Sequence, residues 1–188
     1  MNILASNPDP SPSRLLFSVA LGEWEVEHDT RRNKPIGRGK SYKCSKCGKE
    51  YSASWGCGYT FPLEYEELIK AIKKGKYGEE WKEVLLSDEY TVVDAETHVY
   101  LCRGCNHWTT APGLSLYLPK DPSHAEKKAC VIESDLKDDY KVLKRRIHKC
   151  EKCGSRMHRA SNSELDKLPC PECGGEPEEG SGGMILWD

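Results

Sequence analysis

The chain has 188 residues, of which 37% are hydrophobic and 31% charged, and its formal net charge is −2. With a mean hydropathy of −0.70, this composition argues against one large apolar core as the sole basis of the fold. The longest apolar stretch, Leu15–Leu21, is far shorter than the ~20 residues of a membrane helix, so no membrane partner is expected.

The same stretch lacks the basic start and the cleavage site of an export signal. We therefore expect a cytoplasmic protein whose ten cysteines stay reduced. In that compartment cysteines bind metal more often than they form disulfides.

Several segments have recognisable periodicity. Alternation of Glu with apolar residues around Trp24 predicts a half-buried strand. Apolar residues at helical spacing over 65–72 and again over 77–85 predict two short helices, and Gly75 stands where a left-handed C-cap belongs between them.

Short strands are expected around the second cysteine pair and at the end of the chain. The segment 136–147 fits a helix or a strand, and residues 119–123 have the composition of a linker. The predicted strands are Tyr90–Asp94, His98–Leu101, His107–Thr110, Leu114–Leu118 and Met184–Trp187.

Eight of the ten cysteines form four Cys-x-x-Cys pairs, Cys44/Cys47, Cys102/Cys105, Cys150/Cys153 and Cys170/Cys173. Two thiolates at this spacing can bind one metal at the ~2.3 Å of a zinc–sulfur bond. A residue that tolerates left-handed backbone geometry follows each pair, and these residues are Gly48, Asn106, Gly154 and Gly174. Two such knuckles complete a tetrahedron, so the sequence predicts two structural Zn²⁺ sites.

Spacing favours pairing the knuckles in sequence order. Sixteen residues separate Cys153 from Cys170, within the ~15–20 of a four-cysteine zinc module. The other pairing, of the first two knuckles, spans 54 residues and requires an insertion. The alternatives recruit Cys57 or His107 into a shell, or pair knuckles between the two halves. Cys57 and Cys130 are expected to be small buried thiols.

The motifs Cys150-Glu-Lys-Cys-Gly and Cys170-Pro-Glu-Cys-Gly-Gly resemble the zinc-ribbon superfamily. The first half, with Cys44-Ser-Lys-Cys-Gly, is similar to small bacterial zinc-ribbon proteins of unassigned function. The resemblance implies eight cysteine ligands for zinc, and it implies no activity. Rubredoxin uses the same shell for iron, which leaves a redox protein as an alternative.

The expected fold class is therefore a small, metal-stabilised α+β protein. It has two zinc-ribbon lobes of short antiparallel strands, with two short helices inserted in the first. The expected divisions are a flexible lead-in (1–19), a first lobe (20–120), a linker (121–134) and a second ribbon (135–188).

No catalytic site is expected. A catalytic zinc keeps one position open for water, whereas four complete cysteine pairs favour closed sites. The six histidines have no metal-binding spacing, and no phosphate loop or nucleophile motif occurs. We therefore expect neither an enzyme nor a small-molecule substrate.

Basic residues gather in two runs, at 31–49 and 141–159, each with eight Lys or Arg. One interpretation is a protein-interaction adapter with separate basic and acidic surfaces. The alternative is nucleic-acid binding through phosphate contacts, although the charges could also pair with acidic segments. The candidate nucleic-acid-binding residues are Arg31, Arg32, Lys43, Lys46, Lys144, Arg145, Arg146 and Lys149.

Overall fold

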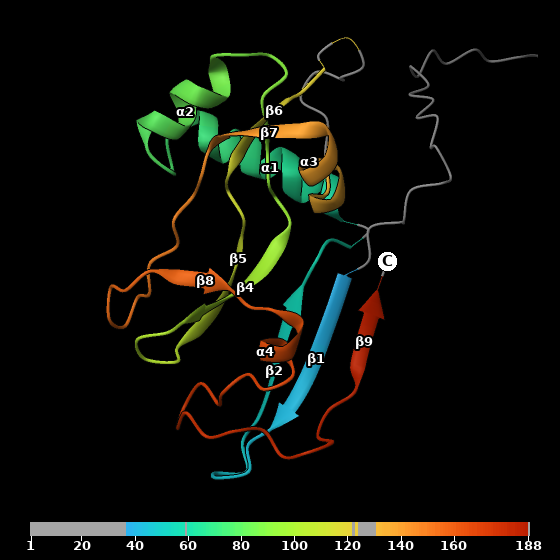
Figure 1. Ribbon diagram of the computed structural model, residues 1–188, viewed down its shortest axis with the longest axis vertical. Coiled ribbons are helices and arrows are strands. Elements are labelled where there is room, and N and C mark those ends of the chain that lie inside the picture. The colour runs from blue at the N-terminus through green and yellow to red at the C-terminus, as the bar shows by residue number, and fades with distance from the viewer. Residues whose placement is uncertain (1–36, 59, 122, 124–130, 188) are drawn as a thin grey trace, which may run out of the picture. The chain divides into compact units, whose positions relative to one another are not determined.

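The computed structural model describes residues 37–58, 60–121, 123 and 131–187. These residues form four α-helices and three antiparallel sheets of three strands each (Figure 1). The α+β class predicted from the sequence is confirmed. The expected lead-in, the strand around Trp24 and Cys130 lie outside the described residues.

The first sheet combines the two ends of the described chain. Strands β1 (Gly37–Lys43) and β2 (Glu50–Trp55) form a hairpin with the first cysteine knuckle as its turn. Strand β9 (Met184–Trp187) pairs with the other edge of β1, giving the order β2-β1-β9. The expected terminal strand therefore forms, as the partner of the first strand described.

The second sheet repeats this arrangement. Strands β4 (Thr97–Cys102) and β5 (Trp108–Pro112) form a hairpin around the second knuckle. Strand β8 (Met157–Arg159), which follows the third knuckle, pairs with β4 in the order β5-β4-β8. In both sheets the hairpin strand that leads into a knuckle is thus the central strand.

The third sheet contains no cysteine knuckle. Its order is β3-β6-β7, with β3 (Val92–Val93), β6 (Leu116–Pro119) and β7 (Tyr140–Lys144). Helix α3 (Glu133–Asp139) runs directly into β7. Segment 136–147, for which the sequence allowed a helix or a strand, therefore contains the end of α3 and all of β7.

The two predicted helices form α1 (Phe61–Lys73) and α2 (Glu79–Leu86). Pro62 stands in the first turn of α1, where its missing N–H costs nothing. Gly75 has φ +76°, as expected of a left-handed cap. The apolar faces of both helices pack on β3 and β6 around Ile72 and Leu85. Among the described residues no helix is long and apolar enough to cross a membrane.

Every sheet takes its third strand from residues 135–188, namely β9, β8 and β7. Strands from the two predicted lobes therefore pair with each other throughout, as the mixed colours within each sheet of Figure 1 show. The predicted layout of two ribbon lobes is not confirmed, and its residue boundaries stay a prediction.

Candidate metal centres

All four knuckles have the same backbone geometry. In each, the N–H of the first cysteine donates to the carbonyl five residues later, and the N–H four residues later donates back to the first cysteine's carbonyl, at 2.8–2.9 Å. The residue after the second cysteine must be left-handed for this turn to close. Asn106 has φ 56°, and the glycines at positions 48, 154 and 174 have φ between 69° and 71°, as the sequence predicted.

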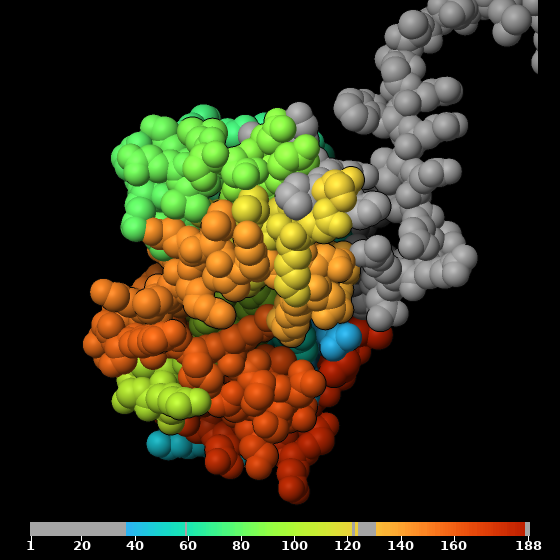
Figure 2. All heavy atoms as spheres, turned by 45° about the horizontal axis from the view of Figure 1, so that its top comes forward, coloured from blue at the N-terminus to red at the C-terminus, as the bar shows by residue number. Residues whose placement is uncertain are grey.

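The knuckles meet in two clusters. The outer cluster contains Cys44, Cys47, Cys170 and Cys173, and the inner cluster contains Cys102, Cys105, Cys150 and Cys153. In each cluster the four sulfurs lie within 4.8 Å of one another. Figure 2 shows the segments near residues 100 and 150, far apart in sequence, side by side on one face.

The sulfur spacing fits a tetrahedral metal. Four ligands at ~2.3 Å from one ion lie about 3.8 Å apart. The outer cluster has Sγ–Sγ distances of 3.5 Å for Cys44–Cys173 and 3.8 Å for Cys47–Cys170. The inner cluster has 3.4 Å for Cys102–Cys153. These separations far exceed the ~2.05 Å of a disulfide, so both clusters can bind a metal ion.

The sequence-order pairing of the knuckles is wrong. The structure pairs the first knuckle with the fourth and the second with the third, which is the between-halves alternative. The physical reason is the sheet pairing, because β9 joins β1 and β8 joins β4. Neither Cys57 nor His107 belongs to a cluster. Cys57 is instead buried in the core beside α1, as expected of a small buried thiol.

Hydrogen bonds from the knuckle turns favour the ionised form of some of the thiols. The backbone N–H of Cys47 lowers the pKa of Cys44 to about 6, and the Ser155 hydroxyl lowers the pKa of Cys153 to about 6. A backbone N–H also stabilises the Cys47 thiolate, but hydrogen bonds with the neighbouring thiols, Cys173 foremost, outweigh it and raise that pKa to about 12. Four thiols this close need a cation before all can ionise.

Three aromatic side chains hold the segment before Cys170 in place. Tyr42 on β1 donates its O–H to the Leu165 carbonyl at 2.6 Å, and Tyr51 on β2 donates to the Leu168 carbonyl at 2.7 Å. Trp108 on β5 donates its indole N–H to the Pro169 carbonyl at 2.8 Å. This segment begins with helix α4 (Asn162–Leu165), whose N-terminus is capped by a capping box at Ser161. These bonds position the fourth knuckle beside the first.

Ion pairs also join the segment around the first knuckle to the segment around the fourth. Lysines of the first basic run pair with acids of the C-terminal segment, as Lys40–Asp166, Lys43–Glu178 and Lys49–Glu172. The described part of the run at 31–49 is therefore partly neutralised by the chain itself. Of the sequence candidates in this run, Lys43 is paired, Lys46 is exposed beside the outer cluster, and Arg31 and Arg32 lie outside the described residues.

The second basic run contributes to a cavity of about 440 Å³ beside the inner cluster, termed here the arginine cavity. Its lining residues are Tyr100, Arg103, Arg146, Ile147, His148, Arg156, Met157, His158 and Arg159. Of the sequence candidates, Arg146 lines it, whereas Lys144 pairs with Glu80 and Arg145 and Lys149 are exposed. Sequence reasoning missed Arg103 as a site residue, because only the fold brings it to this run.

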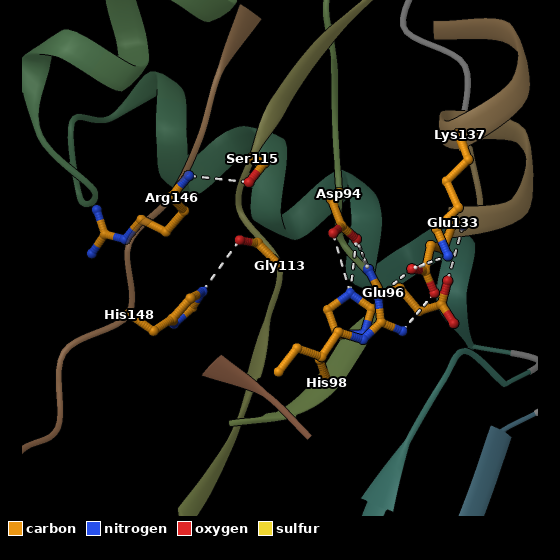
Figure 3. A network of polar contacts seen from close by, with 10 residues as sticks. Asp94, Glu96, His98, Gly113, Ser115, Glu133, Lys137, Arg146 and His148 are labelled. Carbon is orange, nitrogen blue, oxygen red and sulfur yellow. Dashed lines mark hydrogen bonds and ion pairs between the residues drawn. The ribbon is translucent and has the colours of Figure 1, made fainter. Parts of the chain in front are cut away.

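Figure 3 shows a polar network that includes His148 of the cavity lining. His98 Nε2 is 3.1 Å from Asp94 Oδ2, and both side chains are buried. His148 hydrogen-bonds the Gly113 carbonyl at 3.2 Å, and burial lowers its pKa. A Cβ on Gly113 would lie 2.0 Å from Asp94 Oδ2, so only glycine fits there. No sequence motif marked this network.

The fold and its clusters define a small α+β protein with two four-cysteine metal-binding sites that are compatible with zinc-ribbon-like centres. Comparison with protein families, with curated proteins and with solved structures finds no match for this chain.

Proposed function

We propose that both clusters hold Zn²⁺ as closed structural centres and that the protein is not an enzyme. The observation that carries this proposal is the convergence of four sulfurs on each site, since a complete tetrathiolate shell leaves no position for water or substrate. Tetrahedral sulfur sites also suit iron. We favour zinc because a closed shell of four cysteines is its usual structural site in proteins.

Elemental analysis of protein purified without added metal tests this step. Two zinc ions per chain are expected, in a colourless protein. A red protein containing iron would overturn the zinc assignment and restore the rubredoxin-like alternative.

As its activity we propose nucleic-acid binding at the arginine cavity. Arg103 lies between the two cysteines of the second knuckle, and Arg156 follows the third knuckle by three residues. A metal in the inner cluster would therefore fix both backbones, and the planar guanidinium fork of arginine loses less entropy per hydrogen bond to phosphate than a lysine ammonium does. The first basic run supports this role less, because its lysines pair with the chain's own acids.

Oligonucleotide binding measured against salt concentration tests the activity. Affinity is expected to fall as salt rises, through counterion release, and to fall in Arg103→Gln/Arg156→Gln. The matched control is Lys73→Gln/Lys74→Gln, which removes the same charge from exposed residues on and after α1. Absence of binding at low salt, or equal losses in both variants, would contradict the proposal.

A second candidate, the protein-interaction adapter, is favoured by β9. Its residues Met184, Ile185 and Leu186 are 60%, 58% and 59% exposed on an edge strand. An apolar edge of this kind suits a partner that adds a strand. Peptides that are selected for binding to the parent protein should bind the Ile185→Lys variant less tightly. They should bind the Leu63→Lys variant as tightly as the parent, because that change lies at a similarly exposed position on α1. Peptides that bind both variants alike would contradict the adapter role.

A further inference from the structure

The four guanidinium groups of the arginine cavity have different surroundings. Glu133 holds Arg159 through both of its carboxylate oxygens. Arg146 lies over the Trp81 ring at 5.1 Å. Arg103 and Arg156 are exposed and form no ion pair with a carboxylate among the described residues. Among the described residues, three guanidinium groups of the cavity therefore have no carboxylate partner, and Arg103 and Arg156 are the two that also have no ring contact.

The rest of the lining is aromatic and apolar. Tyr100 and His148 stack with their ring centroids 3.7 Å apart and their planes at 22°. Met157 is buried behind them, and Ile147 is half exposed at the cavity. Because Tyr100 is buried beneath this stack, the half-buried His148 ring is the surface that can accept the flat face of an aromatic ring, as bases stack on aromatic side chains in single-strand binding proteins.

From this juxtaposition we propose that the arginine cavity binds one nucleotide that carries a phosphate monoester, with the phosphate between Arg103 and Arg156 and the base against the His148 ring. This deepens the proposed nucleic-acid binding and rests on it. The phosphate monoester can stand at the end of a strand or on a free nucleotide, and both sources present the same chemistry.

Charge decides for a monoester over an internal phosphodiester. A phosphate monoester carries about −1.5 to −2 at neutral pH, whereas an internal phosphate carries −1, so the monoester compensates more of the positive charge that Arg103, Arg146 and Arg156 give the cavity. Arginine also binds the oxygens of a terminal phosphate in a bidentate manner. The volume of about 440 Å³ lies within the ~300–1,000 Å³ of pockets that enclose small ligands.

The test compares one short single strand with and without a 5′-phosphate, alongside nucleoside 5′-monophosphate and nucleoside. The full-length zinc-loaded protein should bind the phosphorylated strand roughly tenfold or more tightly than the 5′-hydroxyl strand. Arg103→Lys/Arg156→Lys keeps the charge but loses the bidentate geometry, so it should lower this preference. The Lys73→Gln/Lys74→Gln control should keep it. Zinc content and circular dichroism establish that each variant is folded.

The outcomes separate the two proposals. Equal binding of both strands overturns the monoester site and leaves nucleic-acid binding intact. Tight binding of free monophosphate with no gain from the attached strand supports the monoester site and overturns nucleic-acid binding. Absence of binding by every probe overturns both.

Discussion

The Sγ atoms of Cys44 and Cys173 lie 3.5 Å apart although 129 positions separate the two residues in the chain. In the inner cluster Cys105 and Cys150 are also 3.5 Å apart, across 45 positions. The stretch of chain that the inner cluster closes, residues 102–153, lies wholly within the stretch that the outer cluster closes, residues 44–173. The two candidate metal sites are therefore nested, and each joins a hairpin turn to a knuckle from the C-terminal third of the chain.

Nested pairing predicts how double substitutions affect metal content. Cys47→Ser/Cys170→Ser removes two ligands of the outer cluster and should cost one zinc per chain. Cys47→Ser/Cys105→Ser removes one ligand from each cluster and should cost both. Pairing in sequence order reverses these results, so metal analysis of the two proteins distinguishes the arrangements. The loss of each site removes a zinc-binding free energy on the order of 10–16 kcal/mol.

Replacement of Gly182 by Ala should detach β9 from β1. A Cβ at Gly182 would lie 1.5 Å from the Ser41 carbonyl oxygen, and φ is +91°. Strain of about 1–3 kcal/mol is expected from the backbone conformation alone. Urea unfolding and amide exchange of β1 measure the effect. Gly183→Ala is the control, since its Cβ meets no atom within 4 Å, and an equal loss there would contradict this explanation.

Tyr42→Phe should destabilise the protein by about 1–3 kcal/mol, because it leaves the Leu165 carbonyl without its buried donor. The matched control is Tyr90→Phe, since the Tyr90 hydroxyl forms no hydrogen bond within the described chain. Denaturant unfolding of both variants gives the comparison. If Tyr42→Phe proves neutral, the hydrogen bond from Tyr42 does not help to position the segment before Cys170.

Glu133→Gln should weaken the link between α3 and β8. Burial by itself raises the pKa of Glu133, but hydrogen bonds from Arg159 and Lys137 outweigh it and lower the pKa to about 2. At pH 7 a loss of roughly 1–2 kcal/mol is expected, allowing for the partly exposed Arg159.

The sign of this pKa shift sets the pH dependence of the Glu133→Gln effect. A depressed carboxylate pKa gives stability that is complete above the ordinary value of 4.5 and is lost as pH falls toward 2. The difference between parent and variant should thus be the same at pH 7 and pH 5 in urea unfolding. A difference that halves over that interval would point to another titrating group. Glu66→Gln, in an exposed pair with Lys70, should have almost no effect.

The sequence by itself determined the local features. Left-handed residues after each Cys-x-x-Cys predicted the four knuckle turns, and apolar spacing predicted α1 and α2, because these depend on neighbours within a few residues. Charge also carried a signal, since the lysines near the first knuckle face an acid-rich C-terminal segment with which they pair. The number of residues between knuckles, which was used to pair them, predicted the wrong pairing.

Only the tertiary structure decided which knuckles share a metal. Loop closure depends on the logarithm of loop length, so nested pairing costs only about 1–2 kcal/mol more than pairing in order. The strand pairs β1–β9 and β4–β8 and the donors Tyr42, Tyr51 and Trp108 outweigh that difference. The same long-range pairings bring Arg103 to Arg156. Contacts between residues this far apart leave no periodic trace in a single sequence.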